Sequence, residues 1–191
     1  VYPDWIKGIA CALGSAGLAF LYSGDMIAFI VTVICSLIGY FGRTLSVRFG
    51  CNEYVGIAIG GFAAMVSAYG FYSHIEQDSL VYVLVCCTLF MIPGVPLINS
   101  VIDTINNHIL SGITRAIRTI LIVGSMTLGM AMALYFSPMP AFSFVDIKPH
   151  VLSIEQIIGS FTAAASFAVL FNAPVRLLVS IGIGGVLCVF I

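Results

Sequence analysis

Three polar side chains recur at four-residue spacing in the middle of an otherwise apolar sequence. Asn99, Asp103 and Asn107 stand at positions i, i+4 and i+8, so a continuous helix would set an amide, a carboxylate and a second amide along one face. A carboxylate can hold an ammonium group or exchange a proton, and amides can bond either end of a small molecule. The stripe predicts a binding site for a small zwitterionic substrate or for a proton.

Cationic and hydroxyl groups follow this stripe. Ser111 and Arg115 come after Asn107, and Arg118 stands three residues further on. A guanidinium in this position can pair with Asp103 or bind the carboxylate of a substrate. The spacing also allows a plainer interpretation, in which Asp103 caps a helix in a cytoplasmic loop and the arginines, Arg118 above all, anchor the chain at the membrane surface.

A helix break is predicted immediately before the stripe. Pro93 removes a backbone donor and Gly94 weakens the helix further, whereas Pro96 has a backbone angle suited to the first turn of a new helix. Such a break leaves carbonyls and amides that protein, water or substrate must satisfy. Polar groups at membrane depth are costly unless they serve a pathway, so residues 93–118 are the predicted functional segment.

The elements that position these groups are membrane helices. The chain is 61% hydrophobic and only 8% charged, with a mean hydropathy of +1.15, and this leaves too few charges to coat a soluble globule. No alternating strand pattern of the membrane-barrel type occurs, so the predicted fold is all-α, a polytopic helical bundle in a membrane. A net charge of -1 with scattered basic residues argues against a nucleic-acid partner.

Seven apolar segments are candidates for membrane crossings of about 20 residues. They cover residues 5–23, 26–42, 54–73, 79–93, 113–136, 155–171 and 175–191. Small residues at four-residue spacing in the third and fifth segments predict close helix packing. These are Gly56, Gly60 and Ala64, and Ser125, Gly129 and Ala133.

The apolar segments divide the chain into two predicted domains. Residues 1–136 form a first five-span membrane domain, residues 137–154 an external linker with three prolines, and residues 155–191 the start of a second membrane domain that is expected to be incomplete. An odd number of spans would insert the second domain upside down, an arrangement typical of secondary transporters with inverted repeats. Asn172, close to Pro174, marks either a matching helix break in the second domain or a turn at a membrane exit.

Basic residues predict the orientation of the chain. If the N-terminus is cytoplasmic, six of the seven Lys and Arg residues lie on the cytoplasmic side and Lys148 lies outside, which agrees with the excess of basic residues in cytoplasmic loops.

The histidines His74, His108 and His150 fall in three separate polar segments, and the six cysteines form no C-x-x-C pair, so no metal site is predicted. No nucleophile, base and orienting group occur together at usable spacing, so no enzyme is predicted.

A resemblance to a known family rests on the same segment. The residues concerned are Pro93, Gly94, Leu97, Asn99, Asp103, Ser111, Gly112 and Arg115. Their pattern resembles the signature P-G-x-x-L-x-N-x-x-x-D followed by S-G-x-x-R of the threonine/serine exporter family, whose members export small amino acids across the bacterial inner membrane. YPDW at residues 2–5 and FNAPVR at residues 171–176 are also similar to that family, and the resemblance extends over nearly the whole chain.

This resemblance implies a ten-span exporter built from two five-span domains, on one chain or on two partner chains. The proton motive force would drive an antiporter without a cofactor, with Asn99 and Asp103 at the site for substrate or proton and with Asn107, Ser111 and Arg115 beside them. The chain has Asn106, Asn107 and His108 where the family commonly has S-G-D, which leaves the substrate open between threonine or serine and a dicarboxylate such as succinate. A passive channel and a non-transporting scaffold subunit remain as alternatives, and a homo-oligomer is one open form of the assembly.

Overall fold

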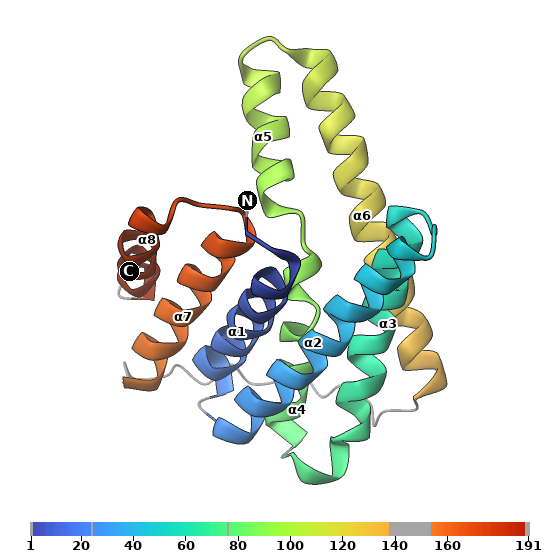
Figure 1. The fold of residues 1–191 in the computed structure, drawn as a ribbon, viewed down its shortest axis with the longest axis vertical. Coiled ribbons are helices and arrows are strands. Elements are labelled where there is room, and N and C mark those ends of the chain that lie inside the picture. The colour runs from blue at the N-terminus through green and yellow to red at the C-terminus, as the bar shows by residue number, and fades with distance from the viewer. Residues whose placement is uncertain (1, 24, 76, 138–153, 190–191) are drawn as a thin grey trace.

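The computed structural model describes residues 2–23, 25–75, 77–137 and 154–189. These residues form eight α-helices and two short 3₁₀ helices (Figure 1). They are α1 (Asp4–Ser23), α2 (Met26–Arg48), α3 (Glu53–Gly70), η1 (Tyr72–His74), α4 (Gln77–Cys86), η2 (Leu89–Met91), α5 (Gly94–Ile105), α6 (Ile109–Phe136), α7 (Ile154–Leu170) and α8 (Val175–Val189). The all-α prediction is confirmed, since the described part of the chain contains no strand.

Fewer helices qualify as membrane spans than the sequence predicts. Among the described residues α1, α2 and α6 are long and apolar enough to cross a membrane, and a fourth span is obtained if α4 and α5 count as one bent element. The third predicted span, α3, is outside this count because Glu53 and several glycines lower its mean hydropathy. The predicted linker at residues 137–154 falls almost entirely outside the described residues.

Helix α2 is longer than predicted, because Arg43 does not end it. The helix runs on to Arg48 and ends where Gly50 adopts a positive φ of 87°. The Gly50 amide donates to the Val47 carbonyl, and the amide of the next residue donates to the Ser46 carbonyl. This pair of bonds is the Schellman motif, in which glycine supplies the left-handed backbone conformation at low cost.

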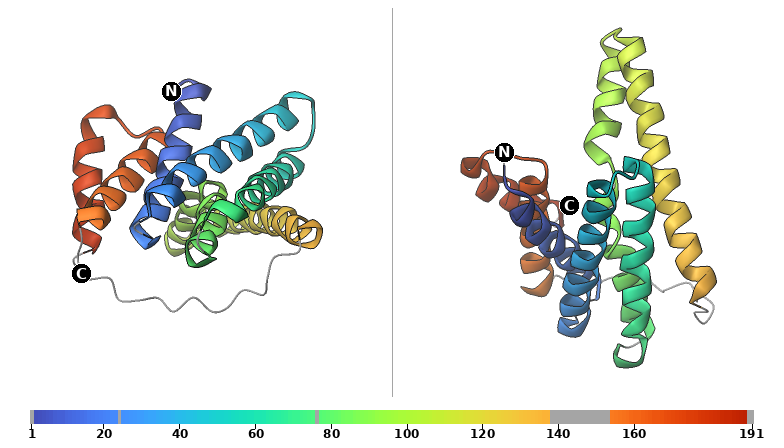
Figure 2. Two further views of the ribbon diagram at one scale, coloured as in Figure 1. Left: turned by 90° about the horizontal axis from the view of Figure 1, so that it is seen from below. Right: turned by 45° about the vertical axis from the view of Figure 1, so that its right-hand side comes forward.

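The helices pack side by side in the order α8, α7, α1, α2, α3, α6, and α4 contacts α1, α2 and α3 (Figure 2). Small residues allow close approach, as predicted. A Cβ on Gly60 of α3 would lie 2.8 Å from the Gly39 carbonyl oxygen of α2, and a Cβ on Gly129 of α6 would overlap the Ala58 carbonyl of α3. The helix backbones are therefore in direct contact at these crossings.

Helix α5 and the first half of α6 form an antiparallel hairpin that projects beyond the rest of the bundle (Figures 1 and 2). The two helices are close because α6 has a glycine at the contact. A Cβ on Gly112 would overlap the Thr104 hydroxyl and lie 2.9 Å from the Ser100 carbonyl oxygen. Large apolar side chains of the hairpin nevertheless stay exposed: Leu97, Ile98, Val101, Ile102, Ile105, Ile109, Leu110, Ile113, Ile117, Ile120 and Leu121.

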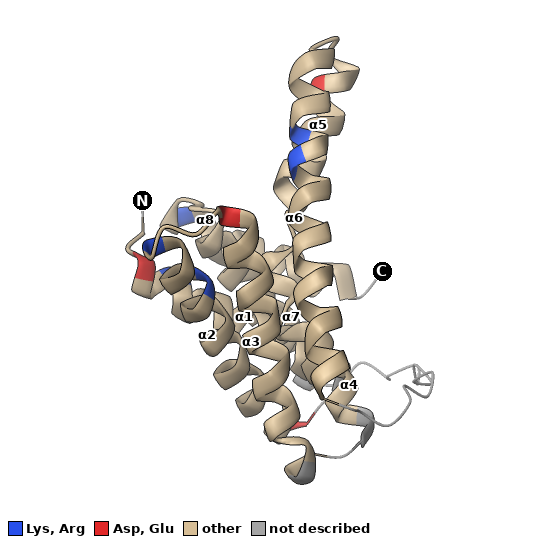
Figure 3. Cartoon of the chain, turned by 90° about the vertical axis from the view of Figure 1, so that its right-hand side faces the viewer, with Lys and Arg blue, Asp and Glu red and all other residues tan. Residues whose placement is uncertain are grey.

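Basic residues gather toward the end of the molecule from which the hairpin projects (Figure 3). In the described part of the chain they are Lys7, Arg43, Arg48, Arg115, Arg118 and Arg176. The seventh basic residue, Lys148, lies outside the described residues. The gathering on one side is consistent with the predicted topology.

Candidate functional site

The predicted helix break is present and begins earlier than expected. Helix α4 ends at Cys86, η2 follows, and α5 starts at Gly94, so that the two halves bend by 53°. The Thr88 hydroxyl donates to the Val85 carbonyl and thereby competes with the helical hydrogen bonds ahead of Pro93. The residue before the proline, Ile92, has extended backbone angles, as expected from the clash with the proline ring.

Helix α5 begins without a side-chain cap. Pro93 occupies the cap position with no side-chain hydrogen bond, and the Gly94 amide turns back to the Ile92 carbonyl. Pro96 stands in the first turn, where a missing amide has no cost. The start of a helix carries uncompensated amides and the positive end of the helix dipole, so it favours a negative charge nearby.

A cavity of about 530 Å³ lies at this break. It is lined by Arg43, Glu53, Ile57, Phe90, Met91, Ile92, Pro93, Val95, Pro96, Asn99, Arg115, Arg118, Ile122, Leu170 and Phe171. Buried Ile57, Phe90 and Met91 also belong to an apolar core cluster. The volume is that of a site for a small molecule, with one apolar side and several charged groups.

Ion pairs from three helices line the cavity. An Arg43 Nη of α2 is 3.6 Å from a carboxylate oxygen of Glu53 at the start of α3, and an Arg118 Nη of α6 donates to the other Glu53 oxygen at 3.0 Å. With Arg115, three guanidinium groups line the cavity, and Glu53 is the one acid among the described residues that do so. The lining therefore carries an excess of positive charge.

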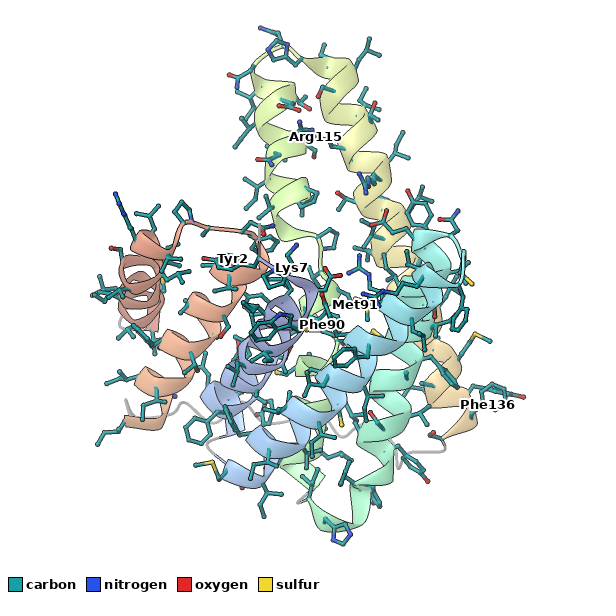
Figure 4. The ribbon with its side chains drawn as sticks, in the orientation of Figure 1. Tyr2, Lys7, Phe90, Met91, Arg115 and Phe136 are labelled. Carbon is teal, nitrogen blue, oxygen red and sulfur yellow. The ribbon has the colours of Figure 1, made fainter. Side chains whose placement is uncertain are left out.

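Asp103 lies in the hairpin just outside that lining. One Asp103 carboxylate oxygen accepts from the Ser111 hydroxyl at 2.8 Å and is 3.2 Å from the Arg115 Nε. Its side chain is 22% exposed, against 49% for Arg115, which lies between the two hairpin helices (Figure 4). The structure thus brings Asp103, Ser111 and Arg115 together, as the first interpretation of the spacing predicted.

The polar stripe does not extend as far as the spacing suggests. Asn99 lies in α5 and lines the cavity, but α5 ends at Ile105 and Asn107 has a positive φ of 62°. The amides of Asn107 and His108 donate to the carbonyls of Thr104 and Asp103, which is again the Schellman motif. Asn107 therefore lies in the hairpin turn, and the prediction that it continues the face of Asn99 and Asp103 is wrong.

Asn172 has the same position at the end of α7. Its φ is 58°, its amide donates to the Val169 carbonyl, and the next amide donates to the Ala168 carbonyl. The Asn172 side-chain oxygen accepts from the Tyr2 amide at 3.3 Å. The structure therefore favours the turn over a second helix break, while Leu170 and Phe171 just before it reach the cavity.

Sequence reasoning missed Arg43 and Glu53 as residues of this site. Both belong to helices distant in the chain from residues 93–118. In the sequence each stands at the edge of a predicted span, where a charge needs no further role. Arg118, which the plainer interpretation of the sequence places at the membrane surface, shares Glu53 with Arg43. No group of three or more His, Cys, Asp or Glu side chains that could hold a metal ion occurs within the described ranges.

The family profile and the curated proteins that match this chain are all described as exporters or transporter subunits. The family profile described as "Putative threonine/serine exporter" matches residues 1–137. The protein named "Probable succinate transporter subunit YjjP" from Klebsiella aerogenes is 25% identical over 141 residues, covering 70% of this chain and 52% of that protein. Its namesake from Escherichia coli K12 is 25% identical over 134 residues, with the same shares. The chain thus spans about half the length of these curated relatives, and no solved structure matches it.

Proposed function

Because this chain belongs to the threonine/serine exporter family, we propose that it is part of a proton-coupled transporter that exports a small carboxylate-bearing metabolite. The match over residues 1–137 confirms the resemblance seen in the signature. One observation supports the substrate class: the cavity at the helix break has three arginines, Glu53 and Asn99 in its lining. Guanidinium groups bind carboxylates in paired hydrogen bonds, and the start of α5 adds its dipole.

The first substrate hypothesis is threonine or serine. Arg115 would grip the substrate carboxylate, and Asn99 would bond its polar groups. Asp103 would hold either the substrate ammonium or a proton, but not both. Competition of substrate and proton for one carboxylate couples their movements in opposite directions, as an antiporter requires. The 3.2 Å contact between Asp103 and Arg115 supports this scheme, because Arg115 lines the cavity and holds Asp103 next to it.

The second hypothesis is a dicarboxylate such as succinate. Three arginines against one glutamate give the lining a positive excess, which suits a doubly negative substrate better than a zwitterion. The names of the two curated relatives point the same way. In this case Arg43 and Arg118 would bind one carboxylate and Arg115 the other.

A second membrane domain would complete the transporter. The exposed apolar side chains of the α5–α6 hairpin would be costly at a water surface, and we propose that this second domain covers them. The curated relatives are about twice the matched length and are named subunits, so the second domain could come from the same polypeptide or from a partner. The assembly would lie in the bacterial inner membrane with a cytoplasmic N-terminus.

The deciding experiment measures efflux of labelled threonine, serine and succinate from vesicles that hold the full-length protein and its second domain. Flux is compared with and without a pH gradient, for wild type, Asp103→Asn and Asp4→Asn. Asp4 pairs with Arg48 at 3.5 Å outside the cavity lining, so its variant is a control for loss of a carboxylate.

The outcomes separate the hypotheses. Gradient-driven efflux of a hydroxy amino acid that is lost in Asp103→Asn but kept in Asp4→Asn supports the first hypothesis. Efflux of succinate alone supports the second. Flux that ignores the gradient would indicate a channel, and unchanged coupled flux in Asp103→Asn would remove this carboxylate from the mechanism. No flux of any of the three would favour a scaffold subunit.

A further inference from the structure

Glu53 lines the candidate cavity and is held there by two ion pairs. It is the first residue of α3, and its two carboxylate oxygens reach different helices, one toward Arg43 of α2 and one to Arg118 of α6. Arg115 and Asn99 line the same cavity from α6 and α5. Among the described residues, this is the place where a side-chain carboxylate meets more than one guanidinium group.

The geometry leaves both arginines with spare hydrogen-bonding capacity. A guanidinium carries five N–H donors, yet Arg43 lies 3.6 Å from Glu53, beyond a good hydrogen bond, and Arg118 makes one bond of 3.0 Å. Neither contact has the paired geometry that an arginine forms with a carboxylate in a strong site. An incoming carboxylate that bonded both groups fully would therefore satisfy more donors than Glu53 does.

The ion pairs of Glu53 contribute little to the stability of the fold. The side chains of Glu53, Arg43 and Arg118 are 39%, 32% and 60% exposed. Ion pairs this open to their surroundings contribute little to stability, because solvent screens them and ordering the side chains costs entropy. A carboxylate placed between two arginines inside a cavity has a larger effect on an anionic ligand, because it repels the ligand and occupies its partners.

We propose that Glu53 is an internal counter-ion that occupies the carboxylate-binding place of Arg43 and Arg118 when the cavity is empty. A substrate carboxylate displaces it, so Glu53 lowers the affinity for substrate and keeps the two arginines paired between transport cycles. This inference rests on the proposed carboxylate specificity of the cavity. It assigns Glu53 as a positioning residue that acts through the arginines.

The test measures equilibrium binding of labelled succinate and threonine to the purified full-length protein in detergent, for wild type, Glu53→Gln and Asp4→Asn. Glu53→Gln removes the competing charge, so the dissociation constant of whichever compound wild type binds should fall by about tenfold. This is the size of effect expected when a charged hydrogen-bonding competitor is removed. Asp4→Asn removes a carboxylate at the same end of the molecule from an ion pair outside the cavity, and should bind as wild type does.

A gain in affinity is a result that a purely structural role cannot produce. Equal or weaker binding by Glu53→Gln, with an unchanged unfolding temperature, would overturn the inference. If Glu53→Gln does not fold, Glu53→Asp keeps the charge but is one methylene shorter, so it should reach the arginines less well and bind substrate more tightly than wild type; equal or weaker binding would again overturn the inference. If neither wild type nor any variant binds either compound, the proposed carboxylate specificity fails and this inference fails with it.

Discussion

At the residue scale, asparagine is used twice where helices end in a left-handed residue. Asn107 and Asn172 have φ values of 62° and 58°, and each donates its amide in a Schellman motif, as Gly50 does at the end of α2. Asparagine tolerates this conformation better than other residues with a Cβ, and glycine tolerates it best. The backbone therefore explains Asn107 without a substrate contact.

We predict that Asn107→Gly leaves both folding and transport intact, whereas Asn107→Ala lowers stability by about 1 kcal/mol because alanine is strained at positive φ. Unfolding temperatures in detergent and efflux rates would check both variants. Loss of transport in Asn107→Gly, with a normal unfolding temperature, would show instead that the amide side chain takes part in the site.

Local spacing identified some of the site residues because they lie within one hairpin. Only the short turn between α5 and α6 separates Asp103 from Ser111 and Arg115 in the sequence. This short separation already limits how far apart the three side chains can be in space. Glu53 and Arg43 come to the cavity only because α2 packs against α3 and α3 packs against α6. Neither residue carries a local pattern that distinguishes it from an ordinary helix-end charge.

At the element scale, the bend between α4 and α5 depends on residues that cannot continue a helix. Pro93 is buried, cannot donate an amide and restricts the residue before it, and α5 starts directly after it. The sequence predicted this break, but it did not predict that α4 stops at Cys86 and that a 3₁₀ turn fills the interval. Proline and glycine are strong local signals, whereas the side-chain bond of Thr88 to Val85 is a weak one.

Replacing Pro93 and Gly94 together by alanine should favour a straighter helix, move the start of α5 and reduce efflux at least tenfold. The reason is that the lining residues before the break, such as Met91, and those after it, such as Asn99, would no longer enclose one cavity. Pro174→Ala is the matched control, since Pro174 precedes α8 and lies outside this cavity lining. Efflux that is unchanged in the double variant would mean that the bend has no role in transport.

Two glycines of α6 offer a test of hairpin packing with opposite expected signs. A Cβ at Gly112 would overlap the Thr104 hydroxyl of α5, while a Cβ at Gly124 would meet no atom within 4 Å. We expect Gly112→Ala to lower the free energy of unfolding by about 1–3 kcal/mol through overpacking. Gly124→Ala should leave it unchanged or raise it by up to about 1 kcal/mol, because alanine favours the helix. Equal effects of the two variants on the unfolding temperature would contradict the close α5–α6 contact.

At the scale of the whole molecule, the hairpin and the basic residues lie toward one end (Figures 1 and 3), and three of those basic residues, Arg43, Arg115 and Arg118, line the cavity. The positive-inside rule would make that end cytoplasmic. An exporter must take its substrate from the cytoplasm, so this orientation would put the arginine-lined cavity where loading occurs. Counting charges along the sequence suggests this orientation and places Arg115 on the cytoplasmic side, but it could not show that Arg43 and Glu53 line the same cavity as Arg115.

The orientation can be tested with cysteines at the two ends of α3. Cys51 is exposed in the turn before α3, and His74 is exposed in η1 after it. The 18 residues of α3 rise about 27 Å, close to the thickness of the hydrocarbon core, so these positions should lie on opposite faces of the membrane. The other exposed cysteine, Cys188, is replaced by serine in both proteins to be labelled, and the remaining four cysteines are buried.

In right-side-out vesicles, a membrane-impermeant maleimide should label the cysteine of a Cys51→Ser, His74→Cys variant and leave native Cys51 unlabelled. Inside-out vesicles should give the reverse result, because a cytoplasmic N-terminus places the α2–α3 turn inside. The opposite pattern in both preparations would invert the topology and move the cavity to the external face. Labelling of both positions from one side would mean that α3 does not cross the membrane. That outcome would agree with the absence of α3 from the set of described helices that are long and apolar enough to span a membrane. An inverted topology would place the cavity where it could not take up substrate from the cytoplasm as proposed.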